Sequence, residues 1–170
     1  STGNVELLAA ANLTNVDTVN ISGNGTVTAN ASATLGSGTY AVGSNATLSL
    51  AADKVSGLTA NGDGTVTVTG TGTGTTDLSN LSAANVDITG ADVTAGVTFM
   101  TVAGGDTLTL TGTQADGKSL SGTGTVAVTA LEGDLAANLS GLASGLTTTA
   151  ALNSTGNVEL LAAANLTNVD

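Results

Sequence analysis

The chain has 170 residues and a formal net charge of −11, because 13 acidic residues are set against only two lysines, Lys54 and Lys118, and there is no His. This charge argues strongly against a nucleic-acid partner and disfavours binding to anionic membrane surfaces, since both need a basic face. The sequence contains no Cys for a disulfide or a thiolate metal site, and no apolar run long enough to span a bilayer.

The chain contains one stretch twice. Residues 1–17 read STGNVELLAAANLTNVD, and residues 154–170 repeat them without a change. This identity predicts one full tandem repeat over 1–153 and the start of the next repeat over 154–170. Neighbouring identical repeats, in the same or an adjacent chain, are therefore the partners that we expect.

Short segments of alternating apolar and polar residues recur along the chain, a pattern typical of strands with one buried face. In chain order they are Asn4–Leu7, Thr26–Thr28, Thr47–Leu50, Thr65–Thr69, Asn85–Ile88, Thr107–Thr111 and Thr125–Thr129. Their first inward residues are expected at Val5, Val27, Leu48, Val66, Val86, Leu108 and Val126, with Leu146 as a weaker candidate. These positions are mostly 18 to 22 residues apart, but the step from Leu146 to Val158 is only 12.

A second motif predicts another face of each coil, where a coil is one circuit of the chain. It has a polar residue, then Leu or Val, then Ser or Thr. It occurs at Asn12–Val16, Lys54–Leu58, Asp77–Leu81 and Asn138–Leu142, with Lys118–Gly122 as a looser copy. Gly, Asn, Asp and Ser cluster between the faces at 22–25, 61–64, 103–106 and 115–117, and such residues favour tight corners.

The spacing predicts an all-β fold, a parallel β-solenoid (β-helix) with coils of about 18–22 residues and seven or eight coils per 153-residue period. One coil cannot bury its own apolar face, whereas stacked coils bury a continuous column of Val, Leu and Ile. A string of immunoglobulin-like sandwiches is the rival fold, and the near-absence of aromatic residues counts against it. Val5–Leu13 and Leu131–Leu142 are rich in helix formers, but their alternation and corner residues favour strands.

The sequence predicts no catalytic, cofactor-binding or metal-binding site. Asp63 and Asp106 lie in acidic corners that could offer oxygen ligands to calcium, although an isolated corner Asp is more often a turn residue. Glu132 and Asp134 could form a carboxylate pair for acid–base chemistry. Without His, Cys or aromatic sugar platforms, we expect the protein not to be an enzyme.

Outward Thr residues form a candidate binding surface. They are Thr26, Thr28, Thr47, Thr65, Thr67, Thr107, Thr109 and Thr125. Regular Thr-x-Thr faces on solenoids resemble the ice-binding surface of some antifreeze proteins, but Ser49 and Ala127 interrupt this array, and Glu6 and Asp87 place charges in it. Asn-x-Ser/Thr triplets begin at Asn12, Asn20 and Asn138, among others, and in a chain of this composition they are mostly compositional.

The low-complexity repeats of Gly, Thr, Asn and Val, such as GDGTVTVTGTGTGTTDLSNLSAANVDITGADV at 62–93, resemble the repeat regions of giant bacterial surface proteins. These include filamentous adhesins and fibre or sheath proteins built on parallel β-helices. The resemblance implies an extracellular or cell-surface location and a structural role as a stiff fibre or adhesin stalk. The alternative is a surface that binds ice or a polysaccharide through Thr and Asn ladders, with a surface glycan as partner.

Overall fold

A computed structural model describes residues 3–93, 95–131, 137–152, 166, 167 and 169. It confirms the predicted fold class, an all-β parallel β-solenoid of about seven turns. The chain divides into two compact units, Ser1–Met100 and Thr101–Asp170, and each is described by itself below.

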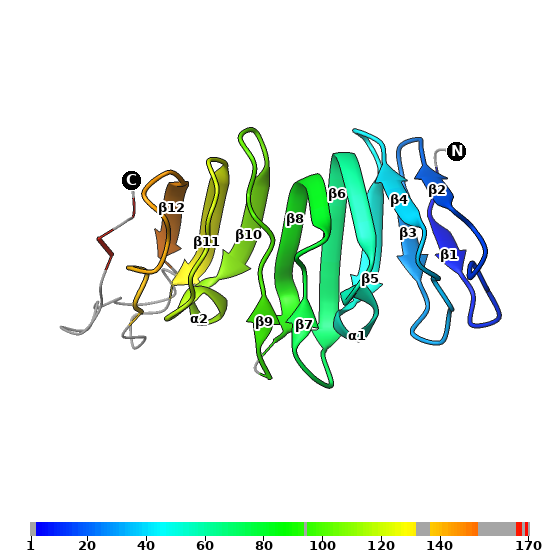
Figure 1. Cartoon of the computed structure of the whole chain (residues 1–170), viewed down its shortest axis with the longest axis horizontal. Coiled ribbons are helices and arrows are strands. Elements are labelled where there is room, and N and C mark those ends of the chain that lie inside the picture. The colour runs from blue at the N-terminus through cyan, green and yellow to red at the C-terminus, as the bar shows by residue number, and fades with distance from the viewer. Residues whose placement is uncertain (1–2, 94, 132–136, 153–165, 168, 170) are drawn as a thin grey trace. The chain divides into compact units, whose positions relative to one another are not determined.

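The first ladder of unit 1 is a parallel stack of five strands that follow one another in coil order (Figure 1). The strands are β1 (Val5–Leu7), β3 (Thr26–Ala29), β5 (Thr47–Ala51), β6 (Thr59–Thr71) and β8 (Leu81–Asp92). The register places Val5, Val27, Leu48, Val66 and Val86 opposite one another in successive strands. The predicted coil spacing of 18–22 residues is therefore confirmed in this unit.

Two further sides complete the coils of unit 1. On the second ladder, β2 (Thr18–Ile21) pairs with β4 (Thr39–Val42), which pairs with the start of β6. On the third side, β7 (Thr76–Asp77) pairs with β9 (Val97–Thr98), and Asn12 forms a bridge to Thr34. All these pairings are parallel, as stacked coils require.

Unit 2 has a parallel ladder of its own, formed by β10 (Thr107–Thr111), β11 (Thr125–Leu131) and β12 (Thr147–Leu152). Leu108 stands opposite Val126, as predicted. The prediction of the next inward residue is wrong, because Val126 pairs with Thr148 and not with Leu146. Leu146 lies instead in a turn, where its N–H donates to the carbonyl oxygen of Ala143. Only ten residues then lead from Thr148 to Val158, at the start of the second copy.

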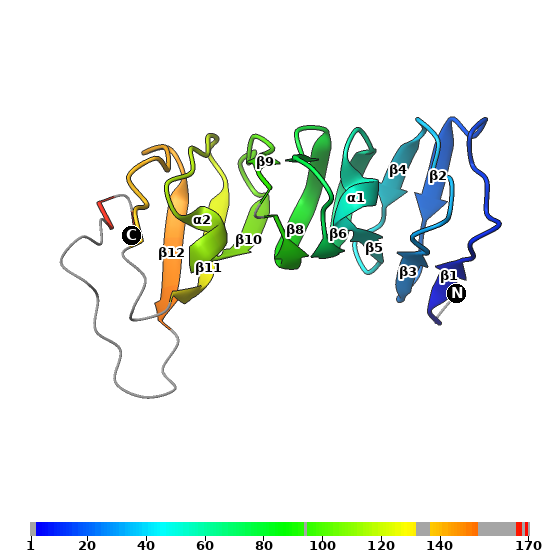
Figure 2. The same ribbon diagram turned by 90° about the horizontal axis from the view of Figure 1, so that it is seen from below.

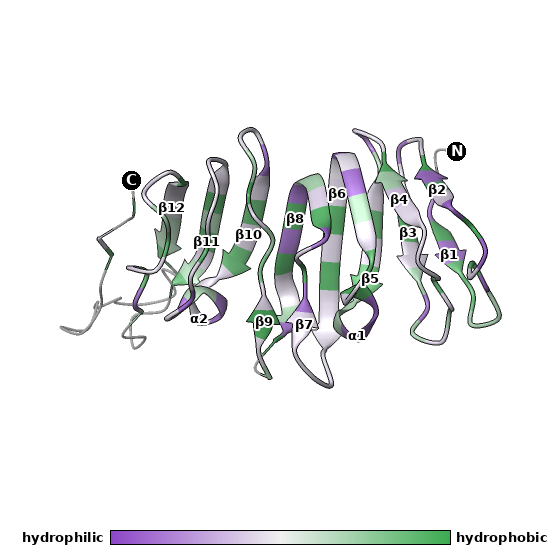
Figure 3. Ribbon diagram, in the orientation of Figure 1, coloured by the Kyte–Doolittle hydropathy of each residue, from purple (hydrophilic) through white to green (hydrophobic). Residues whose placement is uncertain are grey.

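The core follows from the period-2 alternation of the strands. Leu48, Val66 and Leu108 are fully buried, while the Thr and Ser residues on either side of them are half-buried. Figure 3 shows the matching alternation of hydrophobic and more hydrophilic residues along β6 and β8. β-Branched Val and Thr suit a pleated surface with one face in the core and one outside. The core is therefore thin and mostly aliphatic, with Tyr40 as its largest member.

Two segments of the chain repeat one structure, one in each unit: residues 47–70 and 107–130. Gly62 and Gly122 are equivalent in them, with φ angles of +104° and +136°. A Cβ on Gly62 would overlap the carbonyl oxygen of Val42, and a Cβ on Gly122 would overlap that of Val102. Glycine is required at both corners because the neighbouring coil leaves no room for a side chain.

Each repeated segment also contains a one-turn helix, and the sequence analysis predicts neither of them. Helix α1 (Ala52–Val55) follows β5 and packs against β5 and β6 (Figure 2), and α2 (Gly112–Ala115) follows β10. Thr111 caps α2: its Oγ1 accepts the Gln114 N–H at 3.2 Å, and the Gln114 side chain accepts the Thr111 N–H at 2.8 Å. This reciprocal capping box is a recognised helix-start signal in Thr-x-x-Gln.

The two helix-rich stretches behave as the alternation predicts, as far as the structure describes them. Val5–Leu7 forms β1, and the chain then turns, with the Ala11 N–H donating to the Leu8 carbonyl oxygen. Leu131 ends β11, and residues 132–136 lie outside the described residues.

Candidate functional surfaces

The outward Thr residues of unit 1 form two rows across β3, β5 and β6. Thr26, Thr47 and Thr65 stand in one row, and Thr28, Ser49 and Thr67 stand in the other. The second row ends at a charged residue on both sides, because Glu6 pairs with Thr28 and Asp87 pairs with Thr67, whereas Thr65 of the first row pairs with Asn85. The regular Thr array therefore spans three strands.

Unit 2 carries a similar pair of rows on β10, β11 and β12. Thr107, Thr125 and Thr147 form one row, and Thr109, Ala127 and Thr149 form the other. The predicted interruption at Ala127 is confirmed.

Unit 1 also has a third Thr row that the sequence analysis missed. Thr18, Thr39 and Thr59 begin β2, β4 and β6 and stand opposite one another on the second ladder. Their spacing matches the coil length, which is the signal that could have found them. The short strands around them show too little alternation to be recognised alone.

The two acidic corners carry Asp63, which is exposed, and Asp106, which is half-buried. The Asp106 N–H donates to the Ala103 carbonyl oxygen, and the Asp106 carbonyl oxygen accepts the Thr125 N–H. Ala46 makes the same two backbone bonds in unit 1. This corner therefore forms without a carboxylate. Among the described residues no three or more His, Cys, Asp or Glu side chains gather to hold a metal.

The second motif forms a turn that a hydrogen bond between a side chain and the backbone stabilises. The Oδ1 atoms of Asn12, Asp77 and Asn138 accept the N–H of the residue two positions later, at 3.0, 2.9 and 3.2 Å. The hydroxyl of Ser79 and then its backbone N–H hold the pKa of the Asp77 carboxyl below its usual value, against a small opposing effect of burial. These bonds make the polar residue of each motif a turn former.

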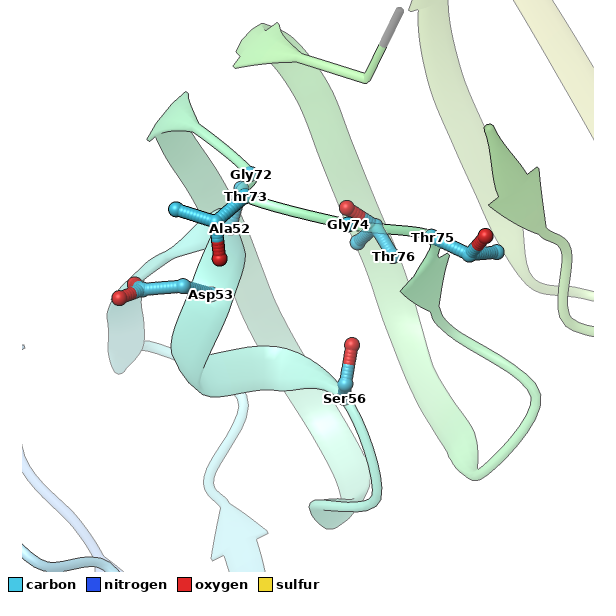
Figure 4. A pocket seen from close by; sticks show the side chains of 8 residues that line it. All are labelled: Ala52, Asp53, Ser56, Gly72, Thr73, Gly74, Thr75 and Thr76. Carbon is cyan, nitrogen blue, oxygen red and sulfur yellow. The ribbon is translucent and has the colours of Figure 1, made fainter. Parts of the chain in front are cut away.

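A small pocket in unit 1 lies between α1 and residues 72–76 and has a volume of about 160 Å³ (Figure 4). Its lining is formed by Ala52, Asp53, Ser56, Gly72, Thr73, Gly74, Thr75 and Thr76. Thr76 is only 1% exposed, and its Oγ1 makes no hydrogen bond within the described part of the protein. The sequence gives no sign of this pocket, since its two walls come from different coils.

The first coil of unit 1 leaves apolar side chains uncovered. Val5, Leu8 and Val16 are 45%, 64% and 37% exposed, whereas Leu48 and Val66 in the same unit are fully buried. These three residues belong to the stretch that the chain contains twice. The first coil is thus an open end of the stack.

The described residues of the second copy repeat a turn of the first. The Val16 N–H donates to the Leu13 carbonyl oxygen at 3.0 Å, and the Val169 N–H donates to that of Leu166 at 3.1 Å. Val169 is half-buried, whereas its counterpart Val16 is exposed. The same backbone hydrogen bond thus forms in both copies.

Glu132 and Asp134, the carboxylates considered for acid–base chemistry, lie outside the described residues. The described part of the chain has no helix that is long and apolar enough to cross a membrane. In comparisons with known proteins, no family model, curated sequence or solved structure matches this chain.

Proposed function

We propose that the chain is a structural repeat module, in which successive 153-residue copies continue one β-solenoid and build a stiff fibre or adhesin stalk. Its place is outside the cell or at the cell surface, and it has no catalytic role. A column of parallel strands suits this work because every coil is hydrogen-bonded to its neighbours along the axis.

The observation that carries the proposal is the repeated turn, Leu13–Val16 in the first copy and Leu166–Val169 in the second. Val16 lies in an open first coil, and Val169 follows the last strand of unit 2 and is less exposed. A preceding copy would cover the exposed Val5, Leu8 and Val16 in the same way. We propose that this exposed apolar surface packs against the preceding copy.

The register across β11 and β12 also supports the number of coils that we propose. Ten residues lead from Thr148 to Val158, fewer than the 18–22 of the other coils. A parallel crossover needs about a dozen residues or more. We therefore propose seven coils per period rather than eight. The next copy would then rejoin the solenoid at its copy of the Leu13–Val16 turn.

Val16→Ser tests this proposal in chains of one and two complete copies. In a single copy Val16 is partly exposed, so the substitution should lower the free energy of unfolding by about 0.5 kcal/mol or less. The same substitution in the second copy of a two-copy chain should cost clearly more, about 1 kcal/mol, because a preceding copy covers that side chain. Asn15→Ser, at an exposed neighbour, is the control and should cost little in both positions. Equal small losses for Val16→Ser in both copies would contradict stacking.

A second candidate function is a binding surface for ice or a polysaccharide, favoured by the two Thr rows on β3, β5 and β6. Rows on flat strands present hydroxyl groups at the regular strand spacing of about 4.8 Å. A thermal hysteresis assay and a glycan array test the two ligands. Thr47→Lys, in the middle of one row, should abolish either activity, and Thr18→Lys, on the second ladder, should leave it unchanged.

A further inference from the structure

We propose that the pocket between α1 and residues 72–76 binds a small neutral polyhydroxy ligand, a single saccharide ring, through the hydroxyl groups of Thr76 and Ser56. This site is distinct from the Thr rows, and the proposal does not depend on the stalk function. It rests on three features of the pocket: an unpaired hydroxyl, a space kept open by glycine, and the charge of its lining.

The first feature is the Thr76 hydroxyl. Figure 4 shows the Thr76 side chain pointing toward α1, into the pocket, while Thr75 points away from it. Thr76 is almost completely buried, and its Oγ1 has no hydrogen-bond partner in the part of the chain that the structure describes. A buried hydroxyl without a partner is costly, and a ligand hydroxyl in the pocket would remove that cost.

Ser56 provides a second hydroxyl on the opposite wall. It follows α1, and in Figure 4 its side chain points toward residues 72–76. Its Oγ accepts the Asp77 N–H at 2.9 Å, which fixes the oxygen in place. A serine hydroxyl has one donor as well as its acceptor lone pairs, so Ser56 can still donate to a ligand.

The absence of a side chain at Gly72 keeps this space open. A Cβ on Gly72 would stand 2.8 Å from the Thr76 Oγ1, so any side chain there would press against the hydroxyl. The volume of about 160 Å³ equals that of roughly five water molecules at about 30 Å³ each. This volume suits one sugar ring.

The residues that line the pocket indicate that the ligand is neutral. The lining contains no Lys or Arg, so nothing in it attracts an anion, and its single carboxylate, Asp53, points away from Thr76 (Figure 4). The groups that do face the space are hydroxyls, which both donate and accept. A neutral molecule with several hydroxyl groups matches them best.

Titration of the ¹⁵N-labelled protein with glucose, galactose and N-acetylglucosamine, followed by amide chemical shifts, tests the proposal. We expect saturable shifts at Ser56 and Gly72–Thr76 for at least one sugar, with a millimolar Kd. Thr76→Val removes the hydroxyl, and Gly72→Ala crowds it, so each should weaken binding at least fivefold. Thr65→Val, in an outward row, should leave the Kd unchanged.

A fold control separates lost binding from lost structure. Thr76→Val removes an unpaired polar group and keeps the shape, so the variant should be at least as stable as the parent in urea without sugar. A variant that is stable and has lost the shifts supports the proposal. Shifts confined to the outward Thr rows, no saturable shift for any of the three sugars, or an unchanged Kd in Thr76→Val would overturn it.

Discussion

Gly122 lies directly on the peptide carbonyl of Val102 in the neighbouring coil, and there is no room for even a methyl group between them. Its φ angle of +136° is also one that side chains rarely adopt. Gly122→Ala should therefore lower the free energy of unfolding by about 3–5 kcal/mol, since strain and overpacking each cost about 1–3 kcal/mol. Urea unfolding measures this loss.

Gly117→Ala is the matched control for this corner. Gly117 also has a positive φ, +63°, but a Cβ there would meet nothing within 4 Å. Ala at this position would only have to adopt an unfavourable positive φ angle, so the free energy of unfolding should fall by about 1 kcal/mol. If the two variants lost the same stability, close contact between coils would not be the reason for glycine at Gly122.

Leu108 and Thr109 are neighbours on β10 that face opposite ways, one into the core and one outward. Leu108 is fully buried and stands opposite Val126 on β11, and Thr109 is half-buried. Leu108→Ala should cost about 2–5 kcal/mol through the cavity that it leaves. Thr109→Ala should cost about 0.5 kcal/mol or less. Losses in the opposite order in urea unfolding would mean that the register of β10 is wrong.

Tyr40 is fully buried, and its hydroxyl donates to the carbonyl oxygen of Leu35. Burial raises the pKa of the Tyr40 phenol above its ordinary value of 10.0. The folded protein therefore keeps this proton at a pH where the unfolded chain has lost it, and stability should fall as the pH rises above 10.0. Tyr40 is the only tyrosine in the chain, so its ultraviolet absorbance reports the titration without interference.

Tyr40→Phe separates the hydroxyl from the ring. It should cost about 1 kcal/mol at neutral pH, because the Leu35 carbonyl oxygen loses its partner. It should also remove the part of the alkaline loss of stability that Tyr40 causes. Titration of Tyr40 at its ordinary pKa in the folded protein would show that the ring is not buried.

Asp77 and Ser79 form the turn of one second-face motif, in which the Ser79 hydroxyl and N–H stabilise the Asp77 carboxylate. Because the pKa of Asp77 is lower in the folded protein, its contribution to stability is present at neutral pH and is lost as the pH falls through that pKa. Asn holds the equivalent turns at Asn12 and Asn138, so Asp77→Asn should fold normally at pH 7. The variant should lose less stability in acid than the parent, and an unchanged acid limb would contradict this role for Asp77.

The fold is largely predictable because the chain repeats one physical pattern. Val27, Leu48 and Val66 begin alternating segments at coil-length spacing, and these positions are the ones that pair. The prediction fails at Leu146, where the inward position is taken by a polar residue, Thr148, inside a run of three threonines. Alternation is invisible in such a run, and only the pairing with Val126 reveals the register.

The site is less predictable than the fold, because it depends on residues that meet only in three dimensions. Ser56 and Thr76 line one pocket from two successive coils, and nothing in the sequence links them. Helix α2 could have been found from Thr111 and Gln114, which form a capping box. Helix α1 has no such cap, and only its equivalence to α2 in the repeated segments would have indicated it.

The length added by each copy tests the stacked solenoid most directly. Chains of one, two, three and four complete 153-residue copies can be imaged by electron microscopy and their contour lengths compared. Seven coils at about 4.8 Å each should add roughly 34 Å per copy to an unbranched rod of constant width. Globular beads joined by flexible segments, or lengths that do not grow in equal steps, would contradict the proposal that successive copies continue one stack.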